Sequence, residues 1–188
     1  MPESVHHEAE SRDARPGSDS RERMRLSMLR DTCLFNHPEE QEYEEFVVAA
    51  SALADTPVAL ISLIDSNRQW FKATVGVEVN EIAHCVEFCT KTIEHENGWL
   101  VVEDTLRDPR FVAHPLVLGG PRIRFLAGMP IRVTDRQLTI GTMCVVDSQP
   151  RHLPADRLTG LRALGRILEN FVTTKISVSA GKSPRPVI

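Results

Sequence analysis

The sequence has no long apolar run and no excess of positive charge, and we expect no secretory leader. No stretch approaches the ~18 consecutive apolar residues that a membrane span needs. The 22 basic and 26 acidic residues give a formal net charge of −4, which argues against the clustered basic surface of a general nucleic-acid binder. The N-terminus is polar and acidic, unlike a signal peptide. We therefore expect a cytoplasmic protein that binds neither nucleic acid nor membrane.

Cysteines are also few, and they do not form a loop-stapling pattern. All lie in apolar or helical contexts, which is typical of reduced thiols packed as small hydrophobic groups. Cys85 and Cys89 are four apart, with His84 and His95 nearby, but zinc usually needs four convergent ligands from two such pairs. We predict no metal site. The four cysteines are Cys33, Cys85, Cys89 and Cys144.

Composition divides the chain into a central domain and two polar ends. Residues 1–22 contain almost no large apolar group and cannot offset the entropy of ordering, so we predict a disordered tail. Residues 23–38 should form a short helix and a linker. Residues 39–174 should form one domain, as expected for a chain of 188 residues. Residues 175–188 should form a flexible tail.

The central region predicts an alternation of helices and strands. Helical spacing of apolar residues predicts helices over residues 38–55 and from 153 to about 174, and a short one over 86–93. Apolar runs between turn signals predict strands over Val58–Ile64, Gln69–Val75, 99–102, 124–133 and Leu138–Asp147. This order predicts an α+β fold, with a central antiparallel sheet of five to six strands and helices packed on it.

The segment before the last two strands is predicted to cross the face of this sheet. Asp108 suits the N-cap of a short helix over residues 108–111, and Pro109 suits its first position. We expect the chain between the Phe88 region and Phe125 to arch over the sheet and leave a void beneath.

Glycines in the last two strands bear on that void. Gly128 and Gly141 either mark bulges or leave room for a ligand, and we favour room. The turn at 134–137 lacks the residues that fix a two-residue hairpin. The sequence therefore leaves open whether Thr142 and Cys144 share a face with Arg124 or with Phe125.

Six motifs, taken together, resemble the GAF domain, a small-molecule sensing module. The resemblance covers roughly residues 39–174 and implies the GAF/PAS-like form of the fold described above. It also implies a non-enzymatic sensory or regulatory module in signal transduction. Its ligand would lie between the sheet and residues 86–111 and would alter the first and last helices. The motifs are TPVALISLID (56–65), RQWFK (68–72), FC (88–89), DPRFVAHPLV (108–117), RIRFLAGMP (122–130) and IGTMCVVD (140–147).

Nine residues around the expected void are candidate ligand contacts, and the identity of the ligand or any cofactor stays unknown. A guanidinium fork suits phosphate or carboxylate. We nevertheless favour ion pairs of Arg110 and Arg124 with Asp104 or Asp108. The nine are Phe88, Cys89, Asp104, Arg110, Arg124, Phe125, Gly128, Thr142 and Cys144.

Two alternative functions stay open. Some stand-alone GAF-like proteins reduce free methionine sulfoxide with cysteines in pocket loops, and Cys89 or Cys144 would then have to be a reactive thiol. A domain whose cavity is filled would instead be a protein-interaction module. No Ser-His-Asp or paired-carboxylate arrangement suggests another enzyme.

Two further ligand classes of the family do not fit. Bilin attachment uses a cysteine followed by histidine, whereas here His84 precedes Cys85. Cyclic-nucleotide binding uses an Asn-Lys pair, whereas Asn67 is followed by Arg68. Apolar stripes over residues 24–34 and 158–171 predict a homodimer. We expect either that the output protein is a separate chain or that this domain is a remnant without an output.

Overall fold

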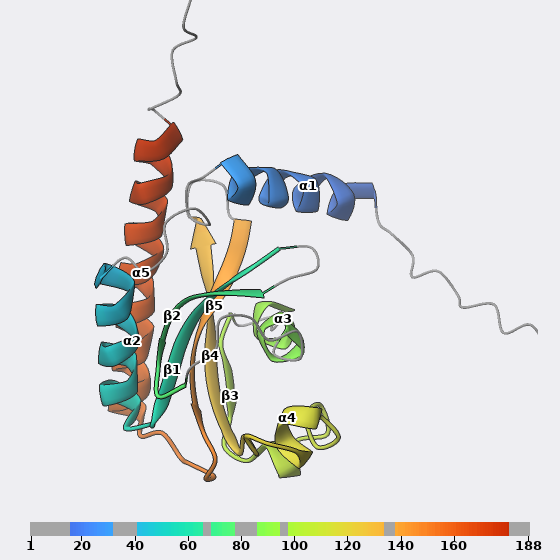
Figure 1. The fold of residues 1–188 in the computed structure, drawn as a ribbon, viewed down its shortest axis with the longest axis vertical. Coiled ribbons are helices and arrows are strands. Elements are labelled where there is room, and N and C mark those ends of the chain that lie inside the picture. The colour runs from blue at the N-terminus through green and yellow to red at the C-terminus, as the bar shows by residue number, and fades with distance from the viewer. Residues whose placement is uncertain are drawn as a thin grey trace, which may run out of the picture.

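The centre of the fold is an antiparallel β-sheet. The computed structural model describes residues 16–31, 41–65, 69–77, 86–94, 98–133 and 138–180. Within these ranges, five strands form one sheet in the order β2-β1-β5-β4-β3 (Figure 1). This confirms the predicted α+β fold. The strands are β1 (Val58–Ile64), β2 (Gln69–Val75), β3 (Leu100–Val102), β4 (Phe125–Val133) and β5 (Leu138–Asp147).

The register of β4 and β5 settles which residues share a face. Cys144 pairs with Gly128 and Thr142 pairs with Pro130. Directly paired residues project from the same side of a sheet, and successive residues alternate between sides. Cys144 packs in one buried cluster with Leu126, whereas Phe125 packs in the other. Thr142 and Cys144 therefore lie on the face opposite to Phe125.

Helices cover both faces of the sheet. Two long helices, α2 (Gln41–Ala54) and α5 (Ala155–Ala180), cover one face (Figure 1). Two shorter ones, α3 (Val86–Glu94) and α4 (Pro115–Leu118), lie on the other face. The N-terminal helix α1 (Pro16–Asp31) crosses near one end of the sheet. No helix in the described ranges combines the length and the apolar composition that crossing a bilayer requires.

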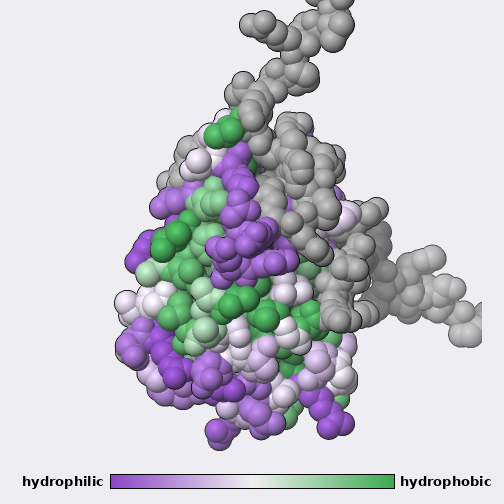
Figure 2. Space-filling view, turned by 60° about the vertical axis from the view of Figure 1, so that its left-hand side comes forward, coloured by the Kyte–Doolittle hydropathy of each residue, from purple (hydrophilic) through white to green (hydrophobic). Residues whose placement is uncertain are grey.

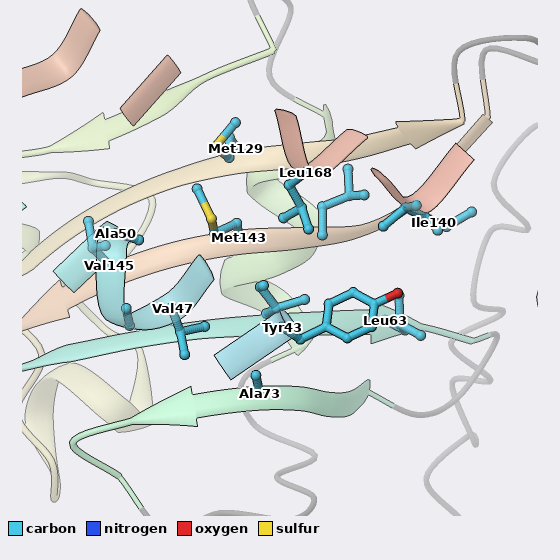
Figure 3. Close-up of a cluster of buried hydrophobic side chains, with 14 of the residues drawn as sticks. Tyr43, Val47, Ala50, Leu63, Ala73, Met129, Ile140, Met143, Val145 and Leu168 are labelled. Atoms are coloured by element: carbon cyan, nitrogen blue, oxygen red, sulfur yellow. The ribbon is translucent and has the colours of Figure 1, made fainter. Parts of the chain in front are cut away.

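The face beneath α2 and α5 is a closely packed apolar core. Val47 and Ala50 of α2 and Leu168 of α5 meet Met143 and Val145 of β5 there (Figure 3). Most of these side chains are less than 5% exposed, and such burial is the main favourable contribution to folding. The apolar stripe of α5 that predicted a dimer is therefore largely used to cover the sheet.

Two helix boundaries differ from the prediction. Residues 16–22 belong to α1 rather than to a disordered tail, because Met28 and Leu29 are buried in the core and anchor the helix. An ion pair between Glu22 and Arg25 supports the preceding turn. At the other end α5 continues past residue 174 to Ala180, since Ile176 is also buried. Residues 1–15, 32–40 and 181–188 lie outside the described ranges.

The crossing segment does not form the helix predicted over residues 108–111. A 3-10 helix, η3 (Thr105–Arg107), precedes it, and Asp104 caps η3 by accepting a hydrogen bond from the Leu106 N–H at 3.1 Å. Asp108 ends η3 instead of starting a helix, and the chain then turns through residues 109–113. The next helix is α4, where His114 is the N-cap and Pro115 takes the first position.

Candidate functional site

Helix α3 packs directly on the middle of the sheet. Cys89 and Thr92 are 2% and 0% exposed. A Cβ added to Gly128 of β4 would lie 2.6 Å from Thr92 Oγ1, and one added to Gly141 would lie 2.0 Å from the Ser62 carbonyl oxygen. The two glycines therefore allow close packing of α3 and of β1. The expectation that they leave room for a ligand is wrong.

A buried polar cluster lies beneath α3, and we call it the thiol cluster. Gln69 Nε2 donates a hydrogen bond to Cys89 Sγ at 2.8 Å, and Ser62 Oγ lies 3.6 Å from the same sulfur. Ser62 Oγ also lies 3.0 Å from Thr142 Oγ1. Cys144 completes the cluster, hydrogen-bonded to Cys89. All five side chains are at most 3% exposed, so water does not compete for these contacts.

The surroundings of Cys89 favour its thiolate. Hydrogen bonds from Cys144 first, then from Thr142, Ser62 and Gln69, lower the pKa of Cys89 from 9.0 to about 7, although burial acts to raise it. Gln69 contributes its amide N–H at a cost. Its buried Oε1 has no hydrogen-bond partner among the described residues, and such an orphan acceptor destabilises a fold by about 1–3 kcal/mol.

Aromatic packing closes the space next to α3. The rings of Phe88 and Phe111 stack with centroids 4.8 Å apart, and His114 meets Phe88 edge-on at 4.4 Å. Leu116, Val117 and Ile123 pack in the same buried cluster. The part of the predicted void around Phe88 and Phe111 is therefore packed with side chains.

An apolar cavity of about 270 Å³ remains beside this packing, between the β1–β2 side of the sheet and α4. We call it the apolar cavity. Its walls come from two strands, from the chain on both sides of α4 and from the end of β5. Apolar side chains predominate, and none of the described lining residues is a Lys or Arg. They are Pro57, Val58, Leu60, Phe71, Gly76, Val77, Leu116, Pro121, Ile123, Val146, Asp147 and Ser148.

The two candidate arginines are engaged by carboxylates. Arg124 donates two hydrogen bonds to Asp104, and Arg110 donates to both oxygens of Asp108. The hydrogen bonds from Arg124 hold the pKa of Asp104 below its usual value, and those from Arg110 do the same for Asp108. Arg110 also lies over the ring of Phe111, with Cζ 5.5 Å from the centroid. These contacts support the ion-pair interpretation, in which the arginines pin the crossing segment.

The structure divides the nine candidate residues into three groups. Five converge beneath α3 in or beside the thiol cluster, three form surface ion pairs on the crossing segment, and Phe125 lies in the core under α2 and α5. None of the nine lines the apolar cavity. The five beneath α3 are Phe88, Cys89, Gly128, Thr142 and Cys144, and the three on the crossing segment are Asp104, Arg110 and Arg124.

Sequence reasoning missed the cavity walls and two members of the thiol cluster. Leu60 and Phe71 look like ordinary core residues in the sequence, and only the position of α4 makes them walls of a cavity. Ser62 did carry a signal, because it is the one polar residue in the apolar run of β1. Gln69 carried no such signal, because a polar residue is ordinary at the start of a strand that follows turn residues.

The candidate metal ligands can be placed only in part. His84, Cys85 and His95 lie outside the described ranges, and Cys89 belongs to the thiol cluster. Among the residues that the structure does describe, no three His, Cys, Asp or Glu side chains gather as a metal ion would require.

Comparisons with known proteins connect this fold to a family. The family model of the GAF domain matches residues 38–171. A cyclic di-GMP phosphodiesterase from Pseudomonas aeruginosa is 37% identical over 144 residues, which are 77% of this chain and 24% of that protein. The chain thus spans about a quarter of the length of this curated relative.

Two solved structures share the fold. One is the GAF domain of an Acinetobacter phosphoenolpyruvate-protein phosphotransferase, with a TM-score of 0.58, 16% identity and coverage of 90% of this chain and 98% of that one. The other is a free methionine-R-sulfoxide reductase from Neisseria meningitidis, with a TM-score of 0.56, 13% identity and coverage of 91% and 96%. At these identities they show the fold alone. Because the family model matches most of the chain and confirms the resemblance of the motifs, the protein belongs to the GAF domain family.

Proposed function

We propose that this chain is a non-enzymatic GAF module of signal transduction that binds a small molecule in the apolar cavity. The observation that carries the proposal is the cavity itself, an apolar space of about 270 Å³ beside α4. Ligand sites are concave, mostly apolar and usually formed before the ligand binds. The proposed ligand site therefore lies next to strands β1 and β2, and not beneath α3 as the sequence led us to expect.

The walls of the cavity favour a small apolar or aromatic ligand. Its volume lies below the range of about 300–1,000 Å³ that is typical of sites for drug-sized ligands. A nucleotide would need cationic partners for its phosphates. The described walls offer none, and Arg110 and Arg124 are bound to carboxylates elsewhere. We therefore propose neither cyclic di-GMP nor another nucleotide as the ligand.

The cavity lies next to the two connections that join the sheet to the long helices, one from α2 to β1 and the other from β5 to α5. Pro57 and Val58 follow the turn that ends α2, and this turn is fixed by the hydrogen bond from Ser51 Oγ to the Thr56 carbonyl oxygen at 2.6 Å. A ligand that favoured one position of this wall would shift α2 with it, provided that it binds one arrangement more tightly than the other.

The other connection runs from β5 to α5. Asp147 lines the cavity and forms an ion pair with Arg151, and Arg151 Nη1 also lies 3.9 Å from Asp55 Oδ2. Arg157 of α5 reaches the same Asp55 oxygen at 3.6 Å. These charged groups join the end of α2 to the start of α5 next to the cavity. We propose this junction as the route by which ligand binding reaches the helices.

The proposal includes no enzymatic activity. The phosphodiesterase similarity covers only a quarter of that protein, and the thiols a methionine sulfoxide reductase would use lie outside the cavity walls. Cys89 and Cys144 are free thiols, which fits the reducing conditions of the cytoplasm. We also propose a homodimer and a separate output protein as partners.

A thermal-shift screen with a cavity-filling control tests the proposal. The probes are indole and phenol as small aromatic molecules, cyclic di-GMP as a nucleotide, and methionine sulfoxide. A bound ligand at 100 times its Kd stabilises the fold by about 2.7 kcal/mol. We expect a shift with an aromatic probe that is lost in Leu60→Phe, which fills the cavity, and kept in the exposed control Val178→Ala. A shift that survives in Leu60→Phe, or no shift with either aromatic probe, would contradict the proposal.

A further inference from the structure

The two buried thiols come from elements that are far apart in the sequence. Cys89 lies on α3 and Cys144 lies in the middle of β5, and the two pack in one buried cluster between α3 and the sheet. On β4 the strand partner of Cys144 is Gly128, which has no side chain to cover the sulfur, and a Cβ there would lie 3.1 Å from it. The register therefore leaves the Cys144 sulfur facing the helix, where it hydrogen-bonds with Cys89.

The groups around the pair are arranged about one sulfur. Ser62 and Gln69 both contact Cys89 Sγ, at 3.6 and 2.8 Å. Gln69 keeps this contact although its own Oε1 is buried without a partner among the described residues. Simple packing of a small hydrophobic thiol needs no such donors. A sulfur that must carry negative charge does need them.

We propose that Cys89 and Cys144 form a redox-active dithiol, which a hydroperoxide oxidises to an intramolecular disulfide that ties α3 to β5. Cys89 is the reacting thiol because the donors converge on it, and Cys144 is the resolving thiol. Neither sulfur lines the apolar cavity, so this proposal does not depend on the ligand proposed above.

The oxidation proceeds in two balanced steps. The Cys89 thiolate attacks one peroxide oxygen, so that an S–O bond forms and the O–O bond breaks. The departing alkoxide or hydroxide takes a proton, and Cys89 becomes a sulfenic acid. The Cys144 sulfur then attacks Cys89, which forms the S–S bond and breaks the S–O bond. The hydroxide released takes the Cys144 proton and leaves as water.

Burial sets the rate of this reaction. The side chains of Cys89 and Cys144 are 2% and 3% exposed, so a peroxide reaches them only when α3 opens locally. Oxidation of the folded protein should therefore be slower than that of the unfolded chain. Once formed, the disulfide should hold α3 in place, since a cross-link reduces the freedom of the open and unfolded chains.

Peptide mapping of the full chain after treatment with hydrogen peroxide tests the proposal. We expect the wild-type protein to lose two hydrogens in mass, to show Cys89 and Cys144 in one linked peptide, and to regain both thiols with dithiothreitol. The oxidised protein should melt at a higher temperature than the reduced one. A linkage that involves Cys33 or Cys85 instead, or four unreacted thiols after prolonged treatment, would overturn the proposal.

Two variants separate the roles of the sulfurs. In Cys144→Ser, oxidation of Cys89 should stop at the sulfenic acid, which dimedone traps as a stable adduct. In Gln69→Leu, the linked peptide should form more slowly because one donor to the thiolate is lost. Equal rates in Gln69→Leu and wild type would contradict the assignment of Cys89 as the reacting thiol. The mapping of the wild-type chain remains decisive if either variant fails to fold.

Discussion

The guanidinium of Arg124 and the carboxylate of Asp104 form two parallel hydrogen bonds, with Nε–Oδ1 at 2.9 Å and Nη2–Oδ2 at 2.8 Å. The same two stretches of chain are joined again through the backbone, where Thr105 N–H donates to the Arg124 carbonyl oxygen at 2.8 Å. The pair therefore ties the start of β4 to the cap of η3. It determines where the crossing segment leaves and rejoins the sheet.

The Arg124–Asp104 pair predicts a specific loss of stability in acid. Because Arg124 lowers the pKa of folded Asp104 below the unfolded value of about 3.9, the folded state binds fewer protons there. The stabilisation is present above about pH 3.9 and is lost as the pH falls through the lowered pKa. We expect Asp104→Asn to melt at a lower temperature than wild type at neutral pH and to lose less stability on acidification. Melting curves across this pH range measure both, and parallel acid slopes would contradict the prediction.

Gly128 predicts a second, steric effect. In Gly128→Ala the new methyl group would lie 2.6 Å from Thr92 Oγ1 and 2.9 Å from Thr92 Cγ2, so α3 or β4 must shift. Overpacking of this kind destabilises a core by about 1–3 kcal/mol. Urea denaturation of Gly128→Ala should show a loss in this range.

The matched control removes the side chain that clashes. Thr92→Ala deletes both atoms closest to the new methyl group, so the double variant should recover part of the loss caused by Gly128→Ala. Recovery stays incomplete because Cys144 Sγ would still lie 3.1 Å away. Losses that simply add in the double variant would show that Thr92 does not press on Gly128.

The burial of Phe111 allows us to predict how much stability is lost when the packing beside α3 is disrupted. Its side chain is fully buried and stacks on Phe88. Removal of a buried aromatic ring costs about 3–5 kcal/mol, so Phe111→Ala should lower the free energy of unfolding by this amount. The neighbouring Val112 is 40% exposed, and Val112→Ala should change it by no more than about 0.5 kcal/mol. Similar losses in both variants would show that the stack does not hold the crossing segment.

The strands could be predicted from the sequence because each is a local pattern. The apolar run of β1 ends at turn residues, and the structure has the predicted bounds of Val58–Ile64. The crossing segment could not be predicted in this way, because Asp104, Asp108 and His114 can each cap a helix. The choice among them depends on contacts with distant residues, of which the Arg124 pair is one.

The candidate site, like the fold, could be predicted from the sequence only in part. Strand alternation placed Thr142 and Cys144 together, as the structure has them, but the sequence could not show that Phe125 faces the opposite way. That depends on a hairpin register which the turn sequence does not fix. A void beneath the crossing segment was predicted, but the walls of the apolar cavity could not be, since they come together only where α4 stands beside β1 and β2.

The face formed by α2 and α5 predicts the surface of a homodimer. After the core is filled, Val48 of α2 and Ile167 of α5 remain 55% and 58% exposed, and Leu53 remains 37% exposed. Hydrophobic residues gather on this side of the molecule (Figure 2). Exposed apolar patches of this kind mark interaction surfaces. We expect native mass spectrometry and sedimentation to detect a dimer of the wild-type chain.

A charge on this face should separate the dimer without unfolding the domain. Ile167→Lys places like charges in a symmetric contact, where burial of an unpaired charge is strongly unfavourable. Leu118 of α4 is 62% exposed on the opposite face of the sheet, so Leu118→Lys adds the same charge away from the contact. We expect Ile167→Lys to sediment as a monomer and Leu118→Lys as a dimer, both with near wild-type melting temperatures. A wild-type monomer, or a dimer that only Leu118→Lys disrupts, would place the surface elsewhere.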